Sequence, residues 1–101
     1  MIELKITGIK KDNGNHYNPY EVVEAYEWEQ PGTSTHGIAP RNVMVGWLDY
    51  GYKGEKVRAY VERVQPRAYC YVNQHENGPK FLQTATDAVK GNNLLELPEI
   101  V

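Results

Sequence analysis

Residues 56–73 (KVRAYVERVQPRAYCYVN) carry the side chains with the most distinctive chemistry in this sequence. Tyrosines are interspersed there with arginines and a lysine. Flat aromatic rings can stack on nucleic-acid bases while cationic side chains hold the phosphates, as in proteins that bind single strands. Tyrosine and arginine also dominate the hot spots of protein interfaces. The candidate partner-binding residues are Lys56, Arg58, Tyr60, Arg67, Tyr69 and Tyr71.

Two structural explanations compete with a binding role for these residues. In the first, a helix covers them; in the second, the tyrosines only pack across neighbouring strands. The composition bears on the kind of partner. The chain has 11 basic and 13 acidic residues, a net charge of −2, whereas affinity for nucleic acid comes largely from neutralising phosphates. A protein or peptide partner is therefore favoured over a nucleic acid.

No set of residues in the sequence is typical of an active site or a metal centre. Ser34 and His36 are close in a segment whose composition is that of a loop, and Glu27 and Glu29 share the solvated face of a predicted strand. The candidate metal ligands lack the C-x-x-C or H-x-x-x-H spacing of known sites: they are His16, His36, Cys70 and His75. We therefore predict no catalytic residue, no metal and no cofactor, and a protein that is not an enzyme.

The candidate binding residues must be positioned by a β-hairpin. Apolar residues alternate with polar and aromatic ones through residues 56–73, with the period of two that is typical of strands. The face opposite the candidates is apolar and predicts core: Val57, Ala59, Val61, Ala68, Cys70 and Val72. In the register where the numbers of directly opposed residues add up to 129, every pair has complementary chemistry. The pairs are Glu62 with Arg67, Tyr60 with Tyr69, Arg58 with Tyr71, and Lys56 with Asn73.

Further strands and one helix flank this hairpin. Alternation predicts strands at residues 2–9 and 20–30, although the Glu and Ala content of the second would also suit a helix. Residues 31–37 (PGTSTHG) predict a loop, and residues 40–50 a helix with an apolar stripe that ends at Gly51. Asn-Gly pairs at 13–14 and 77–78 indicate turns, and residues 80–83 a last short strand.

These elements predict one α+β domain over residues 1–101. The expected architecture is a small, mainly antiparallel sheet of about five strands in the order β-β-α-β-β-β, with one helix packed on it. Such a sheet can curl toward a small barrel. The apolar residues near the end of the chain, which include Leu94 and Leu97, are expected to be buried against it.

The distribution of charge and of cysteine adds two expectations. Residues 1–30 hold three basic and six acidic side chains, whereas residues 53–67 hold five basic and two acidic ones, so acidic and basic strands should lie side by side. Cys70 is the only cysteine, which suits a reducing compartment. No apolar run is long enough to span a membrane, and the alternating first residues do not resemble a signal peptide. The expected location is the cytoplasm.

The end of the chain resembles that of a known family. The stretch Lys80-Phe81-Leu82-Gln83-Thr84, followed by Asp87, Asn93-Leu94-Leu95 and Leu97-Pro98, is similar to the ending of domain-of-unknown-function family 3892, a group of short bacterial proteins. The order of an opening strand, a helix ending in glycine and a strand pair is also similar. The resemblance implies the fold, and it implies no activity, cofactor or site residue.

The sequence thus leads to one functional prediction and one alternative. The prediction is a non-catalytic interaction module that binds a protein or peptide, or another copy of itself, through the Tyr/Arg-rich face of the hairpin or through an exposed edge strand. The alternative is binding of single-stranded nucleic acid through the same face.

Overall fold

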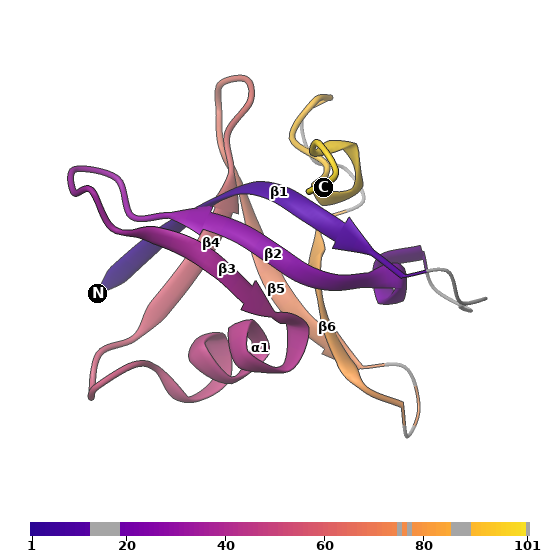
Figure 1. The fold of residues 1–101 in the computed structure, drawn as a ribbon, viewed down its shortest axis with the longest axis horizontal. Helices are drawn as coiled ribbons and strands as arrows, with labels where there is room; N and C mark the ends of the chain where they lie inside the picture. The colour runs from indigo at the N-terminus through magenta and orange to yellow at the C-terminus, as the bar shows by residue number, and fades with distance from the viewer. Residues whose placement is uncertain (13–18, 75, 77, 86–89, 101) are drawn as a thin grey trace.

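The structure is a computed structural model that describes residues 1–12, 19–74, 76, 78–85 and 90–100. In these residues one helix packs on a mixed sheet of six strands (Figure 1), which confirms the predicted α+β class. The strands are β1 (Ile2–Lys11), β2 (Val23–Glu29), β3 (His36–Pro40), β4 (Val57–Val61), β5 (Ala68–Gln74) and β6 (Lys80–Thr84). The helix is α1 (Arg41–Tyr50), and two short 3₁₀ helices are η1 (Pro19–Val22) and η2 (Leu94–Glu96).

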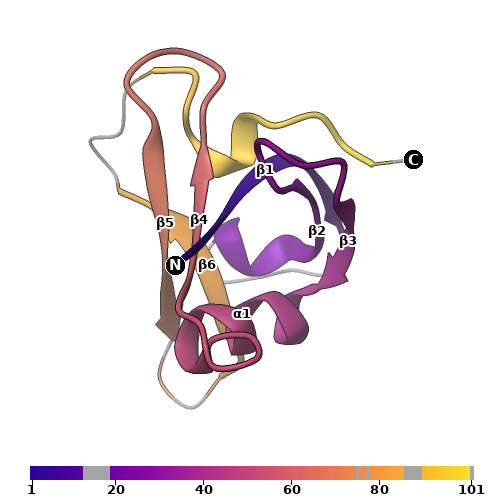
Figure 2. The same cartoon turned by 90° about the vertical axis from the view of Figure 1, so that its left-hand side faces the viewer.

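The strands follow one another across the sheet in the order β3-β2-β1-β4-β5-β6. All neighbours are antiparallel except β1 and β4, which run parallel with Leu4 opposite Ala59. The sheet curls strongly, but it does not close into a small barrel, because β3 and β6 remain its two edges (Figure 2). Helix α1 contacts both of these edge strands and lies against the concave side of the sheet.

One side chain joins the two halves of the curled sheet across its interior. Tyr26 on β2 is fully buried, and its hydroxyl oxygen accepts a hydrogen bond from the backbone N–H of Leu82 on β6, at 3.3 Å. Burial raises the pKa of the Tyr26 hydroxyl, so the group stays protonated at ordinary pH. A side chain therefore satisfies a backbone donor of the edge strand β6.

The end of the chain completes the core, as the sequence predicts. Leu94 and Leu97 are buried in the same cluster as Ile9 and Phe81. The chain then runs beside β1, where the N–H of Ile9 donates to Pro98 O at 3.0 Å and the N–H of Ile100 donates to Ile9 O at 2.8 Å. These bonds satisfy backbone groups of the long first strand beyond its pairing with β4.

The predicted hairpin register is confirmed at its turn end and wrong further along. Tyr60 pairs with Tyr69 and Val61 with Ala68, as expected. The ladder between β4 and β5 holds no pair of Arg58 with Tyr71 or of Lys56 with Asn73. After its first residues β5 diverges from β4, and its residues Cys70 to Gln74 pair with β6 on the opposite edge.

The sixth strand is a correction to the predicted loop at residues 31–37. His36 to Pro40 form β3, because a turn closed by the bond from Gln30 N to Thr35 O (2.9 Å) folds the chain back onto β2. Pro40 is thus the last residue of an edge strand, where a missing N–H is tolerated, and α1 begins one residue later than predicted. In α1 the buried residues are Met44 and Val45.

The second strand begins later than predicted. Residues 19–22 form η1, and β2 covers Val23–Glu29, so the strand prediction is confirmed over the helical alternative for most of the segment. The buried apolar residues of β2 are Val23 and Tyr26, because the pairing of β1 with β2 shifts register twice. The Asn-Gly turn at 13–14, Asn77 of the second Asn-Gly pair, and Asp87 lie outside the described residues.

Candidate functional site

The Tyr/Arg surface, defined as Lys56, Arg58, Tyr60, Arg67, Tyr69 and Tyr71, lies on the side of the sheet away from α1. Val57, Ala59 and Val61, which alternate with these residues on β4, are buried in the core together with Met44 of the helix. Tyr69 and Tyr71 are 38% and 44% exposed. The first structural explanation, in which the helix covers this face, is therefore wrong.

Four of the six residues form a continuous stack. The guanidinium of Arg67 lies over the ring of Tyr60 at 4.2 Å, and that of Arg58 lies over the ring of Tyr69 at 4.3 Å. The two rings meet edge to face, with centroids 5.9 Å apart and planes at 61°. Tyr60 is covered by its neighbours and is only 2% exposed, and its burial raises the pKa of its hydroxyl. Tyr60 is thus a buried member of the surface, and it packs beneath the more exposed Arg67 and Tyr69.

Lys56 and Tyr71 lie outside this stack. In the described part of the chain neither side chain makes a hydrogen bond or an ion pair with the other members of the surface. Arg58, predicted to pair with Tyr71, donates instead to the hydroxyl of Tyr69 at 3.2 Å. The structure therefore brings four of the six predicted residues together and leaves two as exposed neighbours.

Glu3 on β1 completes the site, and it is not among the residues that the sequence pattern indicated. Its carboxylate is ion-paired with Arg58, accepts from Arg67 Nη1 at 3.4 Å, and accepts from the Tyr69 hydroxyl at 3.2 Å. Arg67 is also paired with Glu62, as the hairpin register predicts, at 3.3 Å. The two arginines are thus balanced by two glutamates.

The position of Glu3 follows from the parallel pairing of β1 with β4, in which Glu3 lies opposite Arg58. These two strands are far apart in the chain, since β2, β3 and α1 lie between them. The acidic first segment and the basic hairpin were the available signal in the sequence, and their expected side-by-side placement is confirmed at this point.

The arginines should hold Glu3 in its charged form. The hydrogen bond from Arg58 holds the pKa of the Glu3 carboxyl below its ordinary value near 4.5, against an opposing contribution from desolvation. Because the pKa is lowered in the folded state, Glu3 contributes to stability above about pH 4.5, and the contribution is lost as the pH falls through the lowered pKa. An NMR titration of the side-chain carboxyl carbon should show this lowered midpoint.

Two variants test whether Arg58 is the cause of the lowered pKa of Glu3. Arg58→Gln should raise the pKa midpoint of Glu3 toward the ordinary value, because it removes the guanidinium whose hydrogen bond, together with its charge, lowers that pKa. Arg63→Gln serves as a matched control, since Arg63 is an exposed arginine whose side chain donates to Glu96 O rather than to Glu3. A Glu3 midpoint that is unchanged in Arg58→Gln would contradict the network.

Comparison with known proteins places the chain in a family. The model of a family described as proteins of unknown function, DUF3892, matches residues 4–98 of the 101. The chain belongs to the DUF3892 family. No curated protein and no solved structure matches it. The resemblance inferred from the ending is thus confirmed over nearly the whole sequence.

In this DUF3892 chain, the residues that carried the resemblance have structural roles where the structure describes them. The buried Thr84 hydroxyl accepts from Leu94 N at 3.2 Å, and the Asn93 side chain accepts from Leu95 N at 2.8 Å and caps η2. The neighbouring Asn92, which was not selected from the sequence, is fully buried and bonded to the β4–β5 turn. The ending therefore anchors the fold.

The residues considered for chemistry remain separate. Glu27 accepts a hydrogen bond from the Thr7 hydroxyl at 3.1 Å, and Glu29 is 4.0 Å from the ammonium of Lys5. Burial raises the pKa of the Cys70 thiol to about 12, which keeps it protonated. Among the described residues no three His, Cys, Asp or Glu side chains gather as metal ligands, and His16 and His75 lie outside them. No described helix has the length and apolar character needed to cross a membrane.

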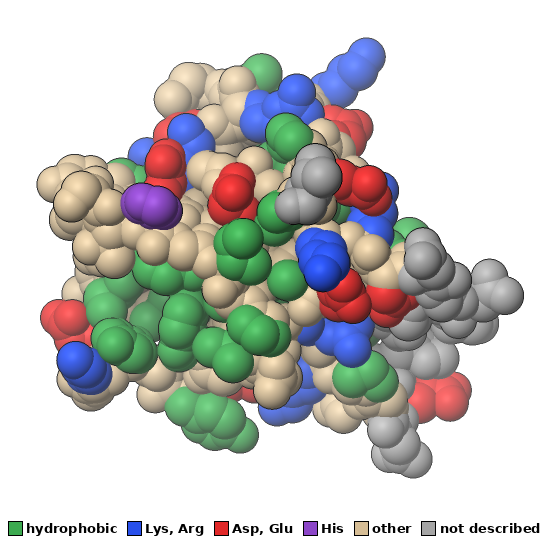
Figure 3. All heavy atoms as spheres, viewed as in Figure 1, with side chains coloured by type: hydrophobic (Ala, Val, Ile, Leu, Met, Phe, Trp, Pro, Cys, Tyr) green, Lys and Arg blue, Asp and Glu red, His purple; other side chains and the backbone are tan. Residues whose placement is uncertain are grey.

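The sequence analysis considered an exposed edge strand without assigning it, and β3 is one of the two edges of the sheet. Its register with β2 is constant, and because Gln30 N bonds to Thr35 O, alternation directs the backbone groups of His36 and Ile38 away from β2. The side chain of Ile38 is 57% exposed, and Val43 and Tyr50 of α1 are also exposed. Figure 3 shows hydrophobic side chains gathered over this region of α1 and β3.

Proposed function

We propose that this chain is a non-catalytic binding module whose Tyr/Arg surface binds a protein or peptide. The observation that carries the proposal is that Glu3 and Glu62 balance the charges of Arg58 and Arg67, while Tyr69 stays partly exposed. A rigid aromatic and guanidinium surface of low net charge has the composition of an interface hot spot. Arginine held in place by a neighbour loses less conformational entropy when it binds a partner.

The same balance disfavours single-stranded nucleic acid, the alternative partner. Binding to phosphates depends on cationic groups that release counterions, and both arginines of the stack already have carboxylate partners. Tyr60, which would be needed as a stacking platform, is covered by Arg67. The remaining exposed residues are too few to form a groove that follows a nucleic-acid backbone: they are Lys56, Tyr69 and Tyr71.

Affinity capture from extracts of the native host tests the proposal. Wild-type protein is compared with the double variant Tyr69→Ser/Tyr71→Ser and with Tyr50→Ser, a control that removes an exposed tyrosine from α1, away from the surface. A partner retained by wild type and by Tyr50→Ser should be lost from the double variant. Analytical ultracentrifugation of the same three proteins tests whether the partner is a second copy. Retention of all partners by the double variant would refute the assignment to this surface.

The two alternatives have their own tests. Fluorescence anisotropy with labelled oligothymidylate and oligouridylate should show no binding at low salt. Tight binding with a steep salt dependence, abolished in Arg58→Ala/Arg67→Ala, would establish the nucleic-acid function instead. Capture that survives Tyr69→Ser/Tyr71→Ser but is lost in Ile38→Pro would place the partner on the β3 edge, since proline removes the outward N–H.

A further inference from the structure

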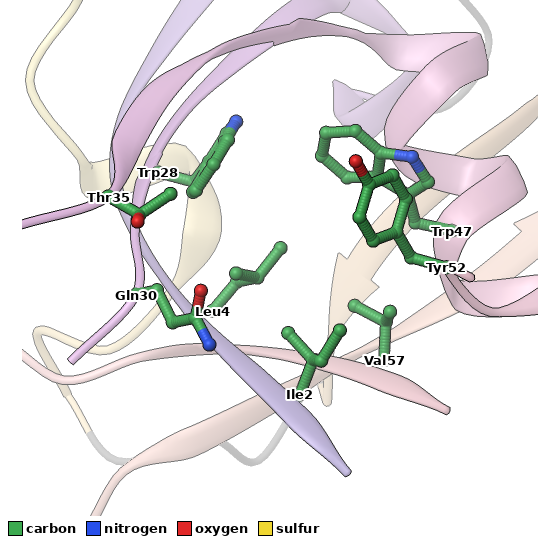
Figure 4. A pocket seen from close by; sticks show the side chains of 8 residues that line it. All are labelled: Ile2, Leu4, Trp28, Gln30, Thr35, Trp47, Tyr52 and Val57. Atoms are coloured by element: carbon green, nitrogen blue, oxygen red, sulfur yellow. The ribbon is translucent and has the colours of Figure 1, made fainter. Parts of the chain in front are cut away.

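A pocket opens at one end of the curled sheet, on the concave side and away from the Tyr/Arg surface. It has a volume of about 170 Å³, and Figure 4 shows its base formed by Ile2 and Leu4 of β1 and Val57 of β4. Gln30 and Thr35, which flank the β2–β3 turn, lie at its rim. Ligand sites often occupy the mouths of barrel-like sheets in this way.

Three aromatic rings form the walls of the pocket. Trp28 of β2 and Trp47 of α1 meet at nearly a right angle, with centroids 5.8 Å apart and planes at 88°. Tyr52, just after α1, meets Trp47 at 5.8 Å and 73°. Figure 4 shows the three rings above the aliphatic side chains of Ile2, Leu4 and Val57. Contacts between the rings hold each wall in place, so the pocket is formed before any ligand arrives.

Trp28 occupies its position at a cost to stability. Its indole nitrogen is buried and has no hydrogen-bond partner among the described residues. The indole packs directly on Gly37 of β3, where a Cβ would lie 3.2 Å from Trp28 Cζ2. An unpaired buried donor is unfavourable. The same indole lines the pocket, where it offers a ligand a large flat surface.

We propose that this pocket binds one uncharged aromatic ring of a small molecule. The volume slightly exceeds that of the roughly 150 Å³ apolar cavity known to accept benzene, so one six-membered ring fits. The residues that line it carry no charge, and most are aromatic or aliphatic. This site is distinct from the Tyr/Arg surface and does not depend on the function proposed for that surface.

The charge around the pocket selects an uncharged ring over a cation. Aromatic cages can hold quaternary ammonium groups, but here the ammonium of Lys53 already lies over the ring of Tyr52, 5.4 Å from its centroid. Among the described residues that line the pocket there is no carboxylate to offset a second positive charge. A neutral ring gains from burial without that repulsion.

Tryptophan signals can detect binding in this pocket without an added label, since both tryptophans of the chain line it. Titration of the full chain with benzyl alcohol should change the intrinsic fluorescence and shift both indole N–H resonances, with a dissociation constant in the roughly millimolar range for so small a ligand. Tetramethylammonium at equal concentration should have no effect. Unchanged indole signals with benzyl alcohol, or tighter binding of tetramethylammonium, would overturn the proposal.

Matched variants locate the binding. Ile2→Phe should fill the pocket and weaken benzyl alcohol binding by about tenfold or more, whereas Ile38→Phe makes the same change on the exposed edge and should have no effect. If Ile2→Phe does not fold, Thr35→Phe at the rim, with its exposed neighbour Ser34→Phe as control, makes the same comparison. Tyr69→Ser/Tyr71→Ser should bind the ring normally. Equal binding by the filled variant and its control would refute the site.

Discussion

Asn92→Ala is expected to lower the free energy of unfolding by about 2–4 kcal/mol. Asn92 is fully buried, and its side-chain oxygen accepts from the N–H groups of Arg63 and Val64 at 2.8 and 3.0 Å. Its amide nitrogen donates to the carbonyl oxygens of Val64 and Pro66. One side chain thus satisfies four backbone groups of the β4–β5 turn, and alanine would leave them without these partners. Urea denaturation measures the loss.

Two further variants separate this effect from general damage to the ending. Asn93→Ala removes the cap of η2 and should cost about 1 kcal/mol, less than Asn92→Ala. Asn92→Asp keeps the acceptor but places a carboxylate oxygen against two carbonyls, so it should be strongly destabilised at neutral pH and less so when protonated at low pH. If Asn92→Ala cost no more than Asn93→Ala, the role assigned to Asn92 would be wrong.

Tyr26→Phe is expected to lower the free energy of unfolding by about 1–3 kcal/mol, because it removes a single oxygen and leaves the buried N–H of Leu82 unpaired. The ring remains, so the apolar packing of the core is unchanged and the loss reports on the hydrogen bond across the sheet interior. Urea denaturation gives the magnitude. Hydrogen exchange of the Leu82 amide gives the location, since exchange there should accelerate more than at the paired amides of β1.

The control for this prediction is Tyr50→Phe, which removes an equivalent hydroxyl from an exposed side chain of α1 and should change the stability by less than about 0.5 kcal/mol. Equal stability of Tyr26→Phe and the wild type would show that water or a small movement of β6 satisfies Leu82. In that case the sheet would be held together at this point by packing alone.

The alternation of apolar with polar residues in the hairpin could be recognised from the sequence, because it depends only on residues that are close together in the chain. Alternation with period two assigned Val57, Ala59 and Val61 to the core, and the pairing of Tyr60 with Tyr69 follows from a short turn. The predicted register was wrong beyond these pairs because β5 diverges from β4 there and continues beside β6 on its other edge. Strand β3 was missed since its short sequence, HGIAP, has little apolar alternation and becomes a strand by pairing with β2.

Composition and alternation were enough to indicate which residues could form the Tyr/Arg surface. The exposure and charge balance of this surface depend on the tertiary structure. It places α1 on the opposite side, buries Tyr60 under Arg67, and brings Glu3 from β1 between the two arginines. The physical reason is that charge balance and exposure depend on contacts between strands some 55 residues apart in the chain, which no local pattern encodes. The same holds for the aromatic pocket, whose walls come from β2, α1 and the segment that follows it.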